Sequence, residues 1–335
     1  MNYLAYHLLG NTENIIVDGR RNNHTRLTLS HWPGNETPPE LKADLSAEIV
    51  LNYLESPQHQ VDVQTVSNNH FDADGLMGLW ALLNPKQALD RRQLLIDVAS
   101  AGDFGVCLDR EAARVSFVLD SWADAERSPL NQEVFQLPYM ELTAVLYEET
   151  LKRLENILDR VEYLEQFWIA EDRLLDHTQE QIAAGNITIE EHPHIDLAVV
   201  TLPEPAETAR KQEISQPWDK LIQTLGIHNE TAMMRVLLRQ ANRYELYFRY
   251  ETWVEFVSRK LMPRVDMTTF ATDLQSREEP GCIWEFEDID ALQPRLRLTG
   301  TAESKIGPAE FQDRLASYLV SQGNYRRNDK RNRKR

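Results

Sequence analysis

The sequence predicts an α/β protein with a parallel-sheet N-terminal domain, a helical connector and a smaller α+β C-terminal domain. Over the first 120 residues, short apolar runs typical of buried strands alternate with helical or loop segments, as in parallel sheets joined by crossovers. A long stretch with helical periodicity follows, and then a mixture of strand-like and helical segments. With 335 residues, of which 42% are hydrophobic, the chain is long enough to form two cores.

These changes of pattern set the expected domain boundaries. The α/β domain spans residues 1–140, the helical connector residues 141–185 and the α+β domain residues 186–322. The remaining basic stretch, residues 323–335, is expected to be disordered because it cannot bury enough apolar surface.

In the N-terminal domain, each expected strand is a short apolar run followed by polar residues. The runs are 14–17, 27–30, 61–66, 94–99 and 115–119. One helix is expected over residues 44–54, with Asp44 or Ser46 as its N-cap, and another over residues 76–83.

The rest of the chain is expected to begin with helix and to continue as a mixed sheet. Leucines at spacings of three and four predict helix between residues 142 and 184. Further helices are predicted after Asp266, through residue 274, and over residues 308–319. Strands are predicted at 187–190, 197–202, 234–239, 244–254, 282–286 and 296–298.

The strongest candidate site lies in a strand–loop–helix unit at residues 61–84. Its loop holds His70, Asp72 and Asp74, and Gly75 relieves the steric limit on a tight turn. Residues at i, i+2 and i+4 of an extended chain point to one side, so the three side chains can converge. Divalent ions take carboxylate oxygens, and imidazole joins them around manganese, iron or zinc. The alternative is a turn with a helix cap, which aspartate and glycine also favour.

Further acids follow other expected strands. Asp18, Asp103 and Asp120 each stand after an apolar run. Open α/β sheets bind ligands beyond the carboxyl ends of their strands, so acids distant in sequence can meet along one edge. Asp103 lies between Gly102 and Gly105, where a cap or a turn is the alternative, and Asp120 stands in an ordinary turn opening.

The segment HFDADGLMGLWALL resembles the first motif of the DHH phosphoesterase superfamily, above all of its single-strand exonuclease branch. His70 stands where that branch has its first aspartate. Other branches place a histidine four residues before the first of two aspartates, and here that position is Asn68.

A second resemblance lies upstream. NIIVDG and DLSAEIVLNYLES are similar to the family's D-H-H segment and the helix that follows it, so this chain resembles a permuted relative. Asp18 matches the aspartate of that triplet, whereas Gly19 and Arg20 replace its two histidines, with His24 and His31 nearby.

The resemblance implies a divalent-metal-dependent phosphoesterase. Its metal ligands would be His70, Asp72, Asp74, Asp103 and Asp18, with His70 and Asp74 as catalytic residues and Mn²⁺, or else Mg²⁺, as the ion. The substrate would be a phosphorylated small molecule or an oligonucleotide. The family's second domain usually carries a G-G-G-H loop, but this chain has only Pro280-Gly281-Cys282, so substrate contacts cannot be carried over.

In place of the glycine-rich loop, arginine side chains are expected to contact the substrate. Arg239, Arg243, Arg249 and Arg264 concentrate cations in an acidic protein, and their planar guanidinium groups suit phosphate. We expect Arg249, Arg264 and His31 to contact substrate. The alternative is that most of these arginines pair with the abundant carboxylates.

Two other functions stay open. The missing histidines and the missing glycine-rich loop favour a non-catalytic nucleotide-binding or regulatory protein on the same scaffold, and a metal-dependent hydrolase of a non-phosphate substrate is the third possibility. His192, His194 and Asp196 have metal-like spacing, but Pro193 and the apolar run that follows favour a turn into a strand.

Composition limits the partners and the compartment. A net charge of −17 argues against a surface built for non-specific nucleic-acid binding. Cys107 and Cys282 are far apart without zinc-type spacing, which suggests a reducing compartment. No signal-peptide pattern and no run of eighteen apolar residues is present. We therefore expect a cytoplasmic protein without a membrane span, of open oligomeric state.

Overall fold

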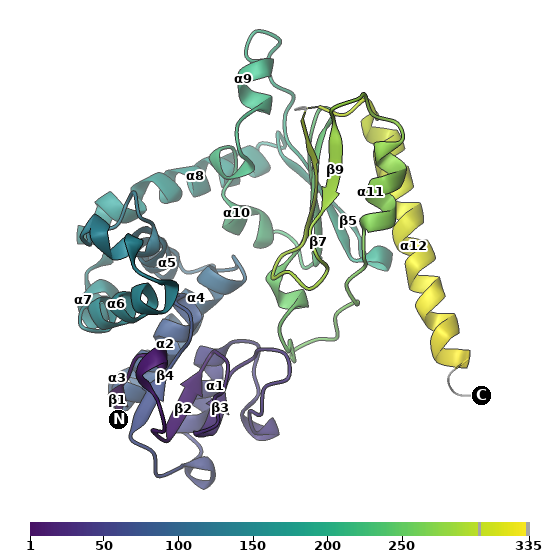
Figure 1. Cartoon of the computed structure of the whole chain (residues 1–335). Helices are drawn as coiled ribbons and strands as arrows, with labels where there is room; N and C mark the ends of the chain where they lie inside the picture. Colours follow the sequence, from purple (N-terminus) through teal and green to yellow (C-terminus); the bar gives the residue numbers. More distant parts are fainter. Residues whose placement is uncertain (301–302, 333–335) are drawn as a thin grey trace. The chain divides into compact units, whose positions relative to one another are not determined.

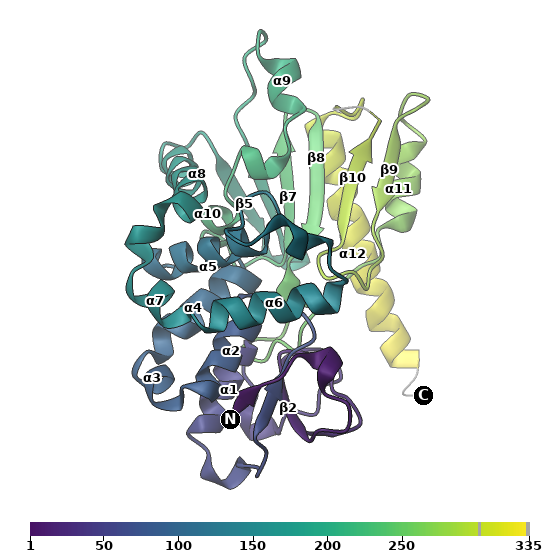
Figure 2. The same cartoon turned by 60° about the vertical axis from the view of Figure 1, so that its left-hand side comes forward.

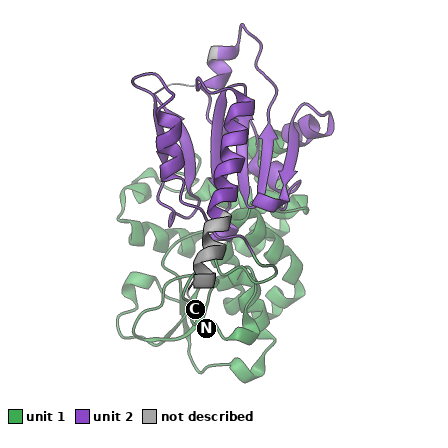
Figure 3. Cartoon of the chain, turned by 90° about the vertical axis from the view of Figure 1, so that its right-hand side faces the viewer, with its two compact units in different colours: residues 1–175, 254–260 green, residues 176–253, 261–335 purple. Residues whose placement is uncertain are grey.

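The computed structural model confirms the α/β class. It describes residues 1–300 and 303–332, with the backbone alone for residue 211 and for residues 323–332. The chain divides into two compact units (Figure 3). Unit 1 contains residues 1–175 and 254–260, and unit 2 contains residues 176–253 and 261–335. The predicted boundaries at 140 and 185 stay predictions.

Unit 1 contains a four-stranded sheet in the order β1-β4-β2-β3. All neighbouring strands are parallel, as predicted. The strands are β1 (Asn2–Tyr3), β2 (Asn14–Val17), β3 (Thr25–Leu29) and β4 (Thr65–Ser67). The central strand β2 is buried along its whole length, which agrees with its apolar sequence.

Of the helices of unit 1, α1 and α2 lie against this sheet (Figures 1 and 2). Helices α1 and α2 pack against each other and against the sheet, and α4 packs on α2. The helices are α1 (Ser46–Leu54), α2 (Ala73–Leu83), α3 (Pro85–Asp90), α4 (Arg92–Asp103), α5 (Arg110–Ala123), α6 (Tyr139–Leu151), α7 (Leu154–Asp159) and α8 (Glu165–Ala183), the last of which continues past Leu175 into unit 2. The predicted helical stretch 142–184 is thus divided among three α-helices.

Two predicted strands are wrong. The run 94–99 lies in α4 and the run 115–119 lies in α5. In α4 the buried residues Leu95, Val98 and Ala99 are spaced three and four apart, which is helical rather than strand periodicity. Helix α5 is buried almost throughout its length, so its apolar run could not be distinguished from a buried strand. Asp120 therefore lies in a helix and not at a strand end.

Unit 2 contains a six-stranded mixed sheet in the order β5-β6-β7-β8-β10-β9. Strands β6 and β7 are parallel, and the other pairs are antiparallel. The strands are β5 (Thr188–His192), β6 (Leu197–Thr201), β7 (Arg235–Gln240), β8 (Arg243–Phe248), β9 (Ile283–Phe286) and β10 (Arg295–Thr299). Five of these strands lie within about two residues of a predicted strand, but the strand predicted at 244–254 ends at Phe248, and Tyr250–Thr252 form a 3₁₀ helix instead.

Both faces of this sheet are covered. Leu197 and Val199 of β6 point into a core that includes residues of α11 (Thr268–Gln275) and α12 (Pro308–Asn332). Val200 of the same strand points into a second core formed with Trp218. The alternation along β6 follows the two-residue period of a strand. The other helices of unit 2 are short: α9 (Arg210–Ile214) and α10 (Thr224–His228).

Short 3₁₀ helices complete the chain: Tyr6–Leu8, Pro39–Leu41, Pro57–His59, Gln132–Gln136, Val161–Leu164, Pro193–Ile195, Trp218–Lys220 and Tyr250–Thr252. Among the described residues, no helix combines the length and the apolar character needed to cross a membrane. The side chains of the basic stretch 323–335 lie outside the described residues, so its predicted disorder stays a prediction.

Candidate metal centre

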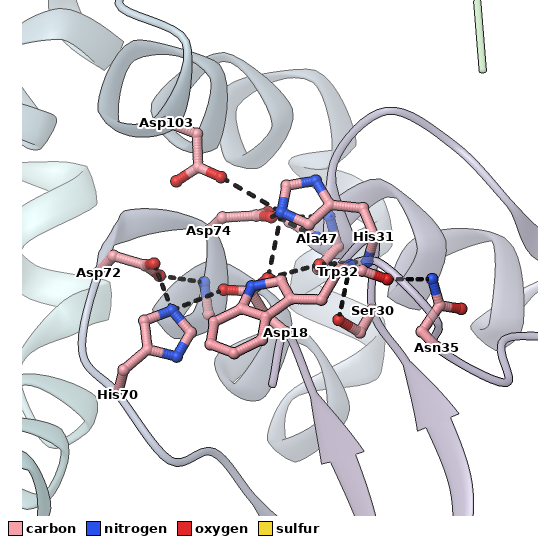
Figure 4. Close-up of polar contacts among 12 residues, drawn as sticks. Asp18, Ser30, His31, Trp32, Asn35, Ala47, His70, Asp72, Asp74 and Asp103 are labelled. Atoms are coloured by element: carbon pink, nitrogen blue, oxygen red, sulfur yellow. Dashed lines mark hydrogen bonds and ion pairs between the residues drawn. The ribbon is translucent and has the colours of Figure 1, made fainter. Parts of the chain in front are cut away.

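The candidate centre lies where the parallel strands of unit 1 end (Figure 4). Asp18 follows β2 directly, and His31 comes two residues after β3. Asp72 and Asp74 stand at the start of α2, after β4, where the Asp72 carboxylate accepts a hydrogen bond from the Gly75 N–H. The carboxyl edge of the sheet therefore gathers these side chains, as the sequence predicts.

Asp18 and Asp74 are fixed by the first residues of α1. The Ser46 hydroxyl donates to Asp18 Oδ1 at 2.7 Å. The two oxygens of Asp74 accept from the backbone N–H groups of Ser46 and Ala47, each at 2.7 Å. The predicted caps are therefore wrong: neither Asp44 nor Ser46 caps this helix with its side chain, and Asp74 satisfies its first N–H groups from another helix.

His31 is buried, with its two ring nitrogens in different surroundings. Nδ1 lies 2.6 Å from the carbonyl oxygen of Asp44. Since a carbonyl only accepts, Nδ1 carries a proton, and Nε2 is the atom that faces the acids. Nε2 lies 3.3 Å from Asp18 Oδ1, 3.7 Å from Asp74 Oδ2 and 3.5 Å from Asp103 Oδ2. An Nδ1–H bound to a carbonyl is the usual arrangement of a metal-ligating histidine.

His70 approaches Asp18 from the other side. Its Nε2 lies 2.6 Å from Asp72 Oδ2 and 3.2 Å from Asp18 Oδ2. The ring of Trp32 lies against the imidazole, with 4.8 Å between the ring centroids. The loop is thus both the helix cap given as the alternative, since Asp72 caps α2, and a source of ligand-type side chains, since His70 and Asp72 lie beside Asp18.

Two groups of ligand-type side chains result, and they share Asp18. One group is Asp18, His70 and Asp72; the other is Asp18, His31 and Asp74. In each group the possible ligand atoms lie within 4.8 Å of one another. Oδ1 of Asp18 faces His31, and Oδ2 faces His70. Asp103 belongs to neither group but contacts His31.

The electrostatics of the cluster favour positive charge. Burial and then repulsion by Asp18 raise the pKa of Asp74 to about 7. Burial alone would lower the pKa of His31, but its contact with Asp18 raises that pKa to about 9. The pKa of His70 is likewise raised, by Asp72 and Asp18 against the effect of burial. Burial opposes ionisation of Asp18, yet its contacts with His31 and His70 hold its pKa well below the usual range.

The chemistry of these side chains suits a metal ion. Four buried or half-buried carboxylates around two imidazoles attract either protons or a metal ion, and both imidazole Nε2 atoms face carboxylates. Buried Asp and His side chains of this centre could therefore hold a metal ion. Binding would displace the protons that the pKa shifts favour on the histidines.

A family model matches residues 1–329 of the chain, described as a family of unknown function, DUF6687. The chain belongs to this family. No curated protein and no solved structure matches it. The resemblance to DHH phosphoesterases stays a prediction.

The DUF6687 chain adds residues to the centre that sequence reasoning did not select. Asn68 and Tyr147 are fully buried, and Asn68 Nδ2 and the Tyr147 hydroxyl make no hydrogen bond within the described part of the chain. A β-carbon on Gly75 would stand 2.3 Å from Asn68 Nδ2 and 2.6 Å from the Tyr147 hydroxyl. Gly75 is therefore required by close packing. Asn68 could have been found from its position before the motif, but no local signal connects Tyr147 to it.

A segment from the C-terminal half of this family member is hydrogen-bonded to His31 and Asp44 of the candidate centre. We give the name strap to residues 254–260, which belong to unit 1 although unit 2 flanks them in sequence. The Glu255 N–H donates to the His31 carbonyl at 2.7 Å. The Asp44 carboxylate accepts from the N–H groups of Val257 and Ser258, at 2.6 and 2.9 Å. The strap therefore holds both His31 and the residue whose carbonyl orients the His31 ring.

The predicted substrate arginines have protein partners in unit 2. Arg249 is 2% exposed and pairs with Glu251. Arg264 donates to the carbonyl oxygens of Ile289, Ala291 and Leu292. Both guanidinium groups thus hold loops of unit 2 together, and their contact with a substrate stays a prediction.

The remaining histidine candidates lie elsewhere. His24 stands in the turn before β3, where its N–H donates to Asn22. Asp196 accepts from the Met234 N–H at 3.0 Å, which agrees with the turn expected at His192-Pro193-His194. Within the described residues, the ligand groups that could surround one ion are the two in unit 1.

Proposed function

We propose that this protein is a divalent-metal-dependent phosphoesterase, similar to the DHH superfamily, acting on a phosphorylated small molecule or an oligonucleotide in the cytoplasm. One observation carries the proposal: the two oxygens of Asp18 face two separate ligand groups. A carboxylate shared in this way is the feature needed to hold two metal ions close together, an arrangement that many phosphoester hydrolases use.

Each ligand group has a defined set of residues. Asp72 and His70 would complete one ion site, and His31 and Asp74 the other, with Asp18 between them. Bound ions would lower the pKa of a water molecule and neutralise phosphate oxygens as the ester bond breaks. Mixed imidazole and carboxylate ligands favour Mn²⁺, with Mg²⁺ as the second choice.

The surrounding residues keep these side chains in place without metal. The N–H groups of α1 fix the Asp74 carboxylate, and the Asp44 carbonyl fixes the His31 tautomer. His70 is the catalytic candidate, because its ring lies at the more exposed side of the cluster, with its side chain 16% exposed compared with 0% for His31. It could act as ligand or as general acid or base.

The second candidate is a non-catalytic nucleotide-binding or regulatory protein on this scaffold. A β-carbon on Gly19 would stand 2.4 Å from Asn69 Oδ1 and 2.9 Å from Asn68 Oδ1. The loop therefore has no room for the imidazole that the DHH triplet would place there. A metal-dependent hydrolase acting on a non-phosphate substrate is the third.

The test begins with metal content and a Mn²⁺-dependent thermal shift. An ion that binds the folded state raises the melting temperature. We expect the shift in the wild type and in the control Asp62→Asn, an exposed acid near the same motif, and its loss in Asp72→Asn/Asp74→Asn. Absence of both metal and shift in the wild type would remove the basis of the proposal.

Hydrolysis then separates the candidates. The phosphoesterase proposal predicts Mn²⁺-stimulated cleavage of a phosphomonoester or phosphodiester, reduced at least about 100-fold in Asp74→Asn. A wild type that binds Mn²⁺ and nucleotide without cleaving either ester supports the non-catalytic candidate. Metal binding together with hydrolysis of a substrate that contains no phosphoester supports the third candidate, a metal-dependent hydrolase of a non-phosphate substrate.

A further inference from the structure

A second candidate site lies in unit 2, around Arg243. This arginine is the first residue of β8, and its guanidinium carbon lies 3.8 Å from the ring centre of the buried Trp218. Its Nη1 is buried and makes no hydrogen bond within the described residues. Burial lowers the pKa of this guanidinium from its usual value. The guanidinium thus lies over the Trp218 ring, but one of its buried donors lacks a hydrogen-bond acceptor, which an anion in the adjoining space would supply.

Neighbouring arginines differ from Arg243 in this respect. Arg239 donates to Thr201 and Gln312, and Arg295 pairs with Glu245. Glu245, the acid closest in sequence, is therefore already bound to another cation. The fold supplies partners to these arginines but leaves a donor of Arg243 inside the protein without one.

Arg243 lines a pocket of about 440 Å³. Arg297, which is half-exposed and pairs with Glu287, also lines the pocket, as does Glu245, whose carboxylate is paired with Arg295. Ile214, Trp218 and Leu298 provide apolar surface. This volume lies in the range of about 300–1,000 Å³ that is usual for small-molecule sites. A planar guanidinium binds the two oxygens of a carboxylate or phosphate side by side.

We infer that this pocket binds the oxyanion group, phosphate or carboxylate, of a small molecule, with Arg243 as its main partner and the apolar wall covering the carbon part. This site is separate from the metal centre and does not depend on the proposed phosphoesterase activity. Unit 2 would then bind a small-molecule anion in this pocket, independently of any metal ion in unit 1.

The experiment titrates the full-length protein with inorganic phosphate and with acetate, in the presence of a chelator so that no metal-bound anion contributes. Binding is measured by calorimetry and by thermal shift. Arg243→Met keeps an apolar stem and removes the charge; Arg243→Lys keeps the charge without the planar fork. The control is Arg277→Met, an arginine that pairs with Glu310 and does not line the pocket.

We expect the wild type and Arg277→Met to bind one of the two anions. Arg243→Met should bind it about 10- to 100-fold more weakly, with Arg243→Lys between them. Binding of phosphate alone assigns a phosphorylated ligand, and binding of acetate alone a carboxylate. The inference is overturned if neither anion binds the wild type, or if Arg243→Met binds as tightly as the wild type.

The ligand-free variants test a purely structural role for Arg243. Because the buried Nη1 makes no hydrogen bond and Arg243→Met loses only the contact with the Trp218 ring, the melting temperature should fall by less than about 5 °C. A larger drop would mean that the cation is needed to hold Trp218, which would also overturn the inference.

Discussion

Gly75 shows how closely the loop at residues 68–75 is packed. In an ordinary helix, replacing glycine with alanine stabilises the protein by about 1 kcal/mol. Here the added β-carbon would meet Asn68 Nδ2 at 2.3 Å and the Tyr147 hydroxyl at 2.6 Å, so the loop must shift. We expect Gly75→Ala to destabilise the protein by about 1–3 kcal/mol, as overpacking does, and to weaken Mn²⁺ binding.

Urea denaturation and a Mn²⁺ titration measure both effects. The control is Gly307→Ala, because a β-carbon at Gly307 meets nothing within 4 Å and its φ is not positive. A Gly75→Ala variant as stable as the wild type would show that Asn68 and Tyr147 can move apart without cost.

Asp172 should make stability depend on pH. It is nearly buried and accepts hydrogen bonds from Arg110 and Arg114. Burial opposes ionisation, but these arginines hold the pKa of Asp172 below its usual value. The native state therefore binds fewer protons than the unfolded state, whose aspartates have a pKa of about 3.9. The pair stabilises the protein above that pH, and this contribution is lost as the pH falls through the native pKa.

We expect Asp172→Asn to lose about 1–3 kcal/mol of unfolding free energy at pH 7, where two arginines lose their charged partner. Near pH 3 the difference from the wild type should be smaller. Denaturation at both values checks this, and an equal loss at pH 7 and pH 3 would contradict the electrostatic explanation.

At the scale of elements, the strap is what links His31 to residues far along the sequence. The Asp44 carboxylate accepts from two strap N–H groups. We expect Asp44→Ala to release the strap, so that its amides exchange with deuterium at least about ten times faster, and to weaken Mn²⁺ binding through His31. Hydrogen-exchange mass spectrometry of peptides covering residues 254–260 measures the first effect.

The matched control is Lys42→Ala. Lys42 also contacts the strap, through an ion pair with Glu255 at 2.6 Å, but both side chains are about 30% exposed. Partly exposed pairs of this kind contribute little, so its effect should be much smaller. Equal exchange rates in Asp44→Ala and the wild type would mean that other contacts hold the strap.

The elements that the sequence predicts well are those with a clear period or a clear turn. Strand β2 is predicted because its apolar run ends in Asp18-Gly19, and helix α2 because its helical spacing follows the polar loop at residues 70–75. The prediction of strands at 94–99 and 115–119 was wrong because a buried helix and a buried strand can both contain a short apolar run. Asp103 nevertheless lies beside His31, at the end of a helix rather than a strand.

The candidate site could be predicted only in part, for a physical reason. His70, Asp72 and Asp74 follow one another in a single loop, so their convergence is visible in the sequence. His31 reaches Asp18 only because two strands pair in parallel, and its ring orientation depends on the Asp44 carbonyl. Such contacts between distant segments leave no local pattern.

At the scale of the whole molecule, unit 1 is completed by residues 254–260, which come after the whole first segment of unit 2, residues 176–253. During synthesis at about 5–20 residues per second, the strap is made on the order of ten seconds after the sheet and every candidate metal ligand. While the nascent chain is still on the ribosome, the acidic cluster would therefore be present before the strap forms its hydrogen bond to His31. Any ion captured in that interval would meet a looser and less selective set of ligands than the finished protein offers.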